Sequence, residues 1–225
     1  MPIVRITRMG WTGVAIIAAG LTILGGWVLW TETRSWRPIV MAISLSQGHI
    51  RTPEFKTNLR TLYIIQIEVM KNQPGDTLSC LLGIRGATSE ACMNTRSVVE
   101  ASWALRSQGV VVARGSTAAE SGGIWMNDAI ARQIGSFMSE KGRSYTLDVN
   151  VLADGSPLAV GNPRLIVGVH PSAYENNALV GVRNVLIAAA FVLAGAIVVI
   201  VSLLKERRHA RDLVRVPSVP SDTSC

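Results

Sequence analysis

Hydrophobic residues gather in two long windows, one near each end of the chain. The windows cover residues 11–31 and 184–204, and neither contains Asp, Glu, Lys or Arg. An α-helix rises about 1.5 Å per residue, so about 20 apolar residues cross a hydrocarbon layer of about 30 Å. A cleaved signal peptide would have a shorter apolar stretch. We therefore predict two transmembrane helices, at residues 11–31 and 184–204.

Basic residues flank both windows on the sides that face the chain termini. Lys and Arg close to a span are retained in the cytoplasm. The orientation therefore places residues 1–10 and 205–225 in the cytoplasm, the latter as a basic stretch that ends in a disordered tail. Residues 32–176 lie outside the cytoplasm, which is the periplasm if the membrane is a bacterial inner membrane. The flanking residues, which are also expected to contact lipid headgroups, are Arg5, Arg8, Lys205, Arg207, Arg208 and Arg211.

Between the windows, apolar and polar residues alternate with a period of two. In the run 145–151 the odd positions are apolar and the even positions polar, which places every second side chain on one face of a β-sheet. Runs at 59–69, 99–105 and 165–169 repeat this pattern, and shorter candidate strands lie at 39–45, 78–84 and 110–113. Several short strands with few helical stretches predict a mainly β extracytoplasmic domain, an antiparallel β-sandwich or jelly-roll-like fold.

Turn residues separate these runs, and one segment is ambiguous. Gly and Pro in 107–109 and 154–157 predict tight connections between strands. Residues 127–138 fit either a helix or a strand, because their apolar positions have helical spacing while Gly135 disfavours a helix. Both alternatives stay open.

Two cysteines fall within the predicted outer domain. Cys80 and Cys92 would lie in an oxidising compartment, where we expect them to form a structural disulfide. A redox-active pair is the alternative, but the spacing differs from a Cys-x-x-Cys motif.

Small residues occur at four-residue spacing in both apolar windows. Such spacing lets membrane helices approach closely, which predicts a packing seam between the two spans or between protomers. The alternative is that Ala and Gly are simply common in such helices. The candidates are Ala18, Thr22 and Gly26 in the first window and Ala190 and Ala194 in the second.

Composition and charge agree with a membrane protein. Apolar residues make up 48% of the chain and charged residues only 16%, below the roughly 25% of soluble domains. Acidic and basic residues nearly balance across residues 32–176, so most of the net charge of +7 lies at the cytoplasmic flanks. This distribution indicates contact with membrane lipid and disfavours nucleic-acid binding.

Candidate catalytic residues are few. The outer domain has two histidines, His49 and His170, and no Cys-x-x-Cys, His-x-x-x-His or Gly-x-Ser-x-Gly pattern accompanies them. We therefore expect a non-enzymatic inner-membrane protein without cofactor or metal. Its β-domain is expected to bind a protein partner, as an accessory or assembly subunit of an envelope complex, or to form a homo-oligomer. A ligand-binding or sensing module and a periplasmic hydrolase are the alternatives.

Overall fold

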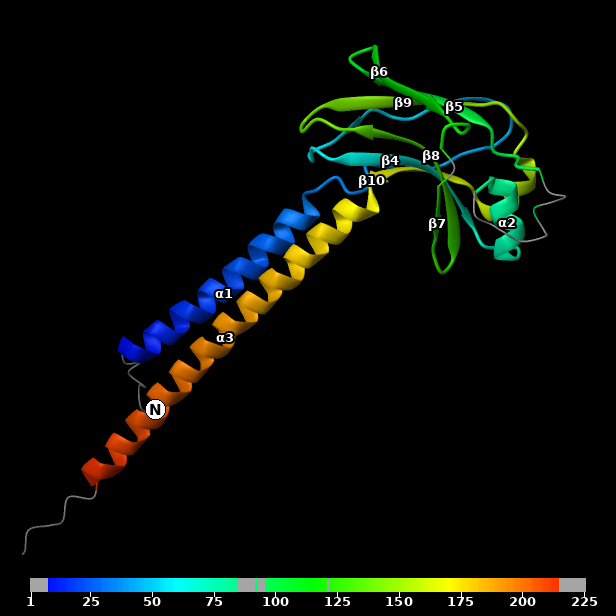
Figure 1. The fold of residues 1–225 in the computed structure, drawn as a ribbon. Helices are drawn as coiled ribbons and strands as arrows, with labels where there is room; N and C mark the ends of the chain where they lie inside the picture. The colour runs from blue at the N-terminus through cyan, green and yellow to red at the C-terminus, as the bar shows by residue number, and fades with distance from the viewer. Residues whose placement is uncertain (1–7, 85–91, 93–95, 121, 215–225) are drawn as a thin grey trace, which may run out of the picture. The chain divides into compact units, whose positions relative to one another are not determined.

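The computed structural model describes residues 8–84, 92, 96–120 and 122–214. The chain divides into two compact units, residues 1–33 with 177–225 and residues Arg34–Asn176. Two long apolar helices, α1 (Arg8–Glu32) and α3 (Pro171–Val214), stand before and after a set of antiparallel β-sheets (Figure 1). This arrangement confirms the predicted order of helix, β-domain and helix. Of the expected basic flank, Arg5 lies outside the described residues, as does the tail 215–225.

Within the first unit, α1 and α3 pack against each other through glycine. A Cβ atom added at Gly13 would lie 2.8 Å from the carbonyl oxygen of Gly195, and one at Gly20 would lie 2.9 Å from that of Ala188. Near the other end of α1, a Cβ at Gly181 would lie 3.1 Å from the ring of Trp27. The contacts run in opposite order along the two helices, so the helices are antiparallel.

The small residues of this contact recur every seven positions. Gly13 and Gly20 are seven apart, as are Gly181, Ala188 and Gly195, and all five are buried. Seven residues make almost two helical turns, the period that keeps one face of a helix against its partner in left-handed packing. The seam between α1 and α3 therefore follows a heptad spacing.

The residues predicted from four-residue spacing lie elsewhere on the helices. Ala18, Thr22, Gly26, Ala190 and Ala194 are all exposed in the single chain. No heavy atom would lie within 4 Å of a Cβ at Gly26. The Thr22 hydroxyl donates to the Ala18 carbonyl of its own helix, at 2.8 Å. These positions do not form the contact between α1 and α3, and a contact between protomers stays a prediction.

The heptad seam predicts the effect of single substitutions in α3. Replacing Gly195 with Leu places a bulky side chain against the Gly13 backbone. We expect this overpacking to lower the free energy of unfolding by about 1–3 kcal/mol. The measurement is the midpoint of SDS-induced unfolding of the full chain in mixed micelles. The substitution Ala189→Leu, at an exposed position of the same helix, is the control. Equal midpoints for the two variants would contradict the seam.

The second unit is a two-layered sandwich of antiparallel strands (Figure 1). One sheet has the order β1 (Ile39–Ala42), β10 (Arg164–Val169), β4 (Leu62–Met70), β8 (Ala129–Met138) and β7 (Gly123–Trp125). The other has the order β2 (Gly48–Arg51), β9 (Ser144–Val151), β5 (Ala101–Ser107) and β6 (Val110–Ser116), with β3 (Phe55–Lys56) also on β9. The short helix α2 (Gly75–Leu82) follows β4, and the 3₁₀ helix η2 (Ser156–Gly161) precedes β10.

The core between the sheets contains many of the side chains that the alternating pattern predicted, together with others from α2 and β8. In β5 and β9 every second residue is buried, as the predicted parity requires. Burial of this apolar surface is the main stabilising term of the sandwich. The fully buried side chains include Tyr63, Ile65, Ile67, Leu105, Leu147 and Leu165.

The structure decides between helix and strand for two segments, residues 127–138 and residues 78–84. Residues 129–138 form β8, so the strand alternative holds for most of the segment 127–138. The expectation of a strand at 78–84 is wrong, because this segment lies largely in helix α2. Pro74 precedes the helix, and Gly83 ends it with a φ of 72°, a conformation that favours glycine. Leu78 and Leu82, four positions apart, then face the core together.

The predicted connection at 107–109 is a two-residue hairpin turn. Gln108 and Gly109 join β5 to β6 with φ angles of 51° and 81°. Positive φ at both positions fits the twist of antiparallel strands, and glycine adopts it freely. This turn places β6 beside β5 at the end of its sheet.

Candidate functional site

The outer face of the sheet β2-β9-β5-β6 carries two rows of side chains. Directly paired residues on neighbouring antiparallel strands point to the same face of a sheet, so register alone defines each row. The first row crosses all four strands as His49, Asn150, Ser102 and Ser116. The second crosses them as Arg51, Asp148, Ala104 and Arg114.

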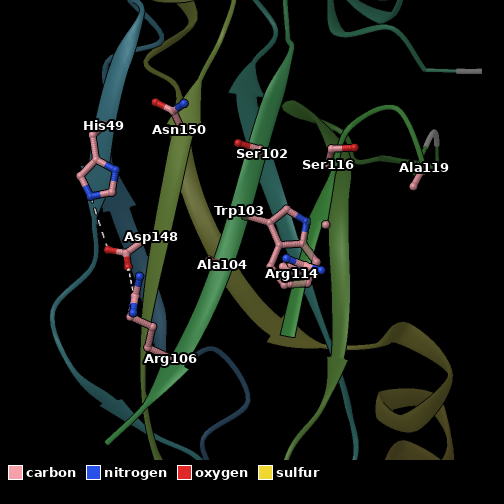
Figure 2. A pocket seen from close by; sticks show the side chains of 11 residues that line it. His49, Ser102, Trp103, Ala104, Arg106, Arg114, Ser116, Ala119, Asp148 and Asn150 are labelled. Atoms are coloured by element: carbon pink, nitrogen blue, oxygen red, sulfur yellow. Dashed lines mark hydrogen bonds and ion pairs between the residues drawn. The ribbon is translucent and has the colours of Figure 1, made fainter. Parts of the chain in front are cut away.

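This face is hollowed where the small residues of the rows lie. A groove of about 780 Å³ extends over the four strands (Figure 2). The short side chains of Ser102 and Ala104 leave its middle hollow. His49 lies at one side, and Arg114 and Ser116, both on β6, lie at the other. Trp103 and Gly115 also line it. The groove is thus a consequence of short side chains between longer ones.

Asp148 is the centre of an ion-pair cluster at one side of the groove. Its carboxylate accepts a hydrogen bond from Arg106 Nε at 2.8 Å. The other carboxylate oxygen lies 3.4 Å from His49 Nε2 and 3.7 Å from Arg51 Nε. The Asp148 side chain is only 13% exposed, so Arg106 and Arg51 compensate a largely buried charge. Figure 2 shows His49 and Arg106 turned toward this carboxylate from two different strands.

Elsewhere in the groove, polar side chains have no protein partners. Among the described residues, Arg114 takes part in no ion pair or hydrogen bond, and the side chains of Ser102, Ser116 and Asn150 form none either. Their hydrogen-bonding capacity is therefore available to a ligand. The two rows contain Arg51, Arg114 and Asp148, and Arg106 lies next to them. The face therefore carries an excess of positive charge.

Trp103 joins the floor of the groove to the core of the sandwich. Its indole Nε1 donates to the Ile134 carbonyl of the opposite sheet, at 2.7 Å. A Cβ at Gly115 would lie 2.8 Å from the ring, and a Cβ at Gly135 would overlap the ring from the other sheet. Because neither glycine has a side chain, the indole fits in the space beside them. Contacts with both sheets therefore fix the position of Trp103 in the groove floor.

A buried arginine binds the end of α2, the residues before β5 and the residues after β6. Arg132, on β8, is 6% exposed. Its Nη1 donates to the carbonyls of Leu82 at 2.6 Å and Val99 at 2.8 Å, and its Nη2 to that of Thr117 at 2.9 Å. Burial lowers the pKa of Arg132, with an opposing contribution from Glu100, but a guanidinium stays protonated in proteins. Because Leu82 is the last residue of α2, this cation also stabilises the helix C-terminus.

The predicted disulfide is present in the same region. Cys80, on α2, is bonded to Cys92. The bridge closes a short loop, which stabilises the fold mainly by restricting the unfolded chain. Arg132 attaches the end of α2 to the sandwich, and the disulfide links α2 to Cys92.

The two histidines are not brought together. His49 contacts Asp148 on the outer face of one sheet, while His170 follows β10 of the other sheet and has its Nδ1 2.8 Å from the Ser172 hydroxyl. Ser102 is separated from His49 by strand β9, roughly 10 Å at two strand spacings, beyond the reach of a general base. Within the described parts of the chain, no three His, Cys, Asp or Glu side chains are grouped to hold a metal ion. The arrangement of the groove is one that binds a ligand through hydrogen bonds and charge.

Sequence reasoning found some of these residues but not the groove. The alternating pattern indicated that Ser102 and Arg106 face outward, but the pairing of β2 with β9 joins residues distant in the chain. The sequence around Arg114 and Arg132 does not indicate that Arg114 is an unpaired surface cation and that Arg132 is a buried one. The predicted headgroup residues Arg8, Lys205, Arg207, Arg208 and Arg211 all lie on α1 or α3.

Comparison with known proteins adds little. No protein-family model and no curated protein matches the chain. A crystal structure of a protein from Sulfurospirillum deleyianum is similar over 59% of this chain and 97% of its own, with 12% sequence identity and a TM-score of 0.44. At this level the similarity carries no argument about fold or function.

Proposed function

We propose that this chain is a non-enzymatic protein of a bacterial inner membrane, with both termini in the cytoplasm. Its β-sandwich lies in the periplasm and binds a protein partner in the groove, as an accessory or assembly subunit of an envelope complex. The groove, with its unpartnered polar side chains, is the observation that carries this proposal.

The two long helices support the membrane part of the proposal. The apolar windows of α1 and α3 have mean hydropathies of 1.9 and 2.9. Only 11% and 17% of these windows are buried against protein, whereas the core helix of a soluble protein would be mostly buried. A hydrocarbon environment would cover the exposed apolar side chains of both helices.

The positions of the basic residues and the disulfide support the orientation. Lys205, Arg207 and Arg208 follow the apolar part of α3, as expected for a cytoplasmic end. The Cys80–Cys92 bond belongs to the sandwich, and such bonds persist in oxidising compartments such as the periplasm.

The edge of the sheet supports a protein as the partner. Among the described strands, β6 pairs only with β5, so its other edge is open beside the groove. Val110, Val111 and Val112 on this strand are 65%, 42% and 41% exposed. Exposed apolar residues on an unpaired edge favour association with another polypeptide.

A steric block of the groove tests the proposal. Ala104→Trp should fill the groove without changing its charge, while Val160→Trp places the same ring at an exposed position on η2. The tagged full chain would be purified from membranes of its own host in mild detergent. We expect wild type and Val160→Trp to retain the same partner in stoichiometric amount, and Ala104→Trp to lose most of it. A wild-type protein that purifies without any partner would refute the proposal.

A further inference from the structure

We propose that the groove recognises an acidic segment of its partner, with a side-chain carboxylate bound by the guanidinium of Arg114. This inference rests on the proposed function and names the chemistry of the bound segment. Arg114 lies on β6, at the side of the groove away from the Asp148 cluster.

Charge complementarity is the first argument. Arg106 is committed to Asp148 at 2.8 Å, and Arg51 lies 3.7 Å from the same carboxylate. Arg114 has no anionic partner among the described residues, so it is the cation left to bind a ligand. A planar guanidinium binds a carboxylate through two parallel hydrogen bonds, which fixes the orientation of the bound group as well as its charge.

The first row of the groove, which runs from His49 to Ser116, fits a polypeptide backbone. Asn150, Ser102 and Ser116 supply both donors and acceptors, as the amide groups of a peptide require. Four strands at about 4.8 Å spacing make the row roughly 14 Å long, which matches about four residues of extended chain. The groove therefore fits a short acidic segment and not a whole domain.

Binding of model peptides to the full chain in nanodiscs of zwitterionic lipid tests this inference. By fluorescence anisotropy at low salt, we expect labelled hexaglutamate to bind wild type, and hexaglutamine to bind at least about 10-fold more weakly. Arg114→Glu should weaken hexaglutamate binding about 10-fold or more, and Arg114→Lys should give an intermediate affinity. The charge reversal Lys141→Glu, in an exposed turn outside the groove, should leave the affinity unchanged.

The possible outcomes separate this inference from the proposed function. Equal binding of the two peptides, or an unchanged affinity of Arg114→Glu, would overturn it even if Ala104→Trp still loses its partner. Displacement of hexaglutamate by equimolar inorganic phosphate would also overturn it, because the site would then be a phosphate site. Since Arg114 is exposed and unpartnered, its variants should unfold at the wild-type temperature, and this is measured alongside binding.

Discussion

Replacing Arg132 with Met should lower the free energy of unfolding of the sandwich by about 3 kcal/mol or more. The guanidinium serves three buried carbonyls, those of Leu82, Val99 and Thr117, at 2.6 to 2.9 Å. Methionine fills a similar volume but donates no hydrogen bond, so these acceptors would be left buried and unsatisfied. The measurement is urea-induced unfolding of the full chain in detergent, followed by near-ultraviolet circular dichroism.

A matched substitution tests whether the loss of stability is specific to the buried arginine. Arg114→Met removes an exposed arginine from β6 and should change stability by no more than about 0.5 kcal/mol. Arg132→Lys should remain strongly destabilised, because one ammonium cannot reproduce a fork that reaches carbonyls on separate segments. Equal stability of the two methionine variants would show that the carbonyls are satisfied without Arg132.

The alternating pattern of the sequence predicted which side chains face the core, because strand parity is a local property. Tyr145, Leu147 and Val149 are buried as their parity required. Residues 78–84 misled the prediction because their apolar content suits either a strand or a short helix. The flanking Pro74 and Gly83 are what favour the helix, through N-terminal tolerance of proline and positive φ at the C-terminus.

The groove depends on register between distant strands, which no local pattern contains. His49 and Asn150 are directly paired, although β2 and β9 are separated by most of the domain's sequence. The seam between α1 and α3 was missed for another reason. The prediction used a four-residue spacing of small residues, whereas Gly13, Gly20 and their partners follow the seven-residue period of an antiparallel helix pair.

Gly135→Ala should destabilise the sandwich by about 3 kcal/mol, although a Gly-to-Ala change within a strand ordinarily stabilises it. The new methyl group would overlap the indole of Trp103. The ring cannot move away freely toward β6, because Gly115 lies close to it there. Even an added Cβ atom at Gly115 would lie only 2.8 Å from the ring. Movement of the ring would also break its 2.7 Å hydrogen bond to the Ile134 carbonyl. Urea unfolding and near-ultraviolet circular dichroism would report the loss.

Two further variants test whether the indole is the cause of this effect. Gly122→Ala is the control, since its Cβ would have no neighbour nearer than 3.7 Å. Trp103→Phe removes the overlapping part of the ring, so the double variant with Gly135→Ala should be more stable than the sum of the two single changes predicts. Additive effects would place the strain elsewhere in β8. Because Trp103 also lines the groove, a destabilised indole should weaken hexaglutamate binding in Gly135→Ala as well, which links the packing of the core to the shape of the binding surface.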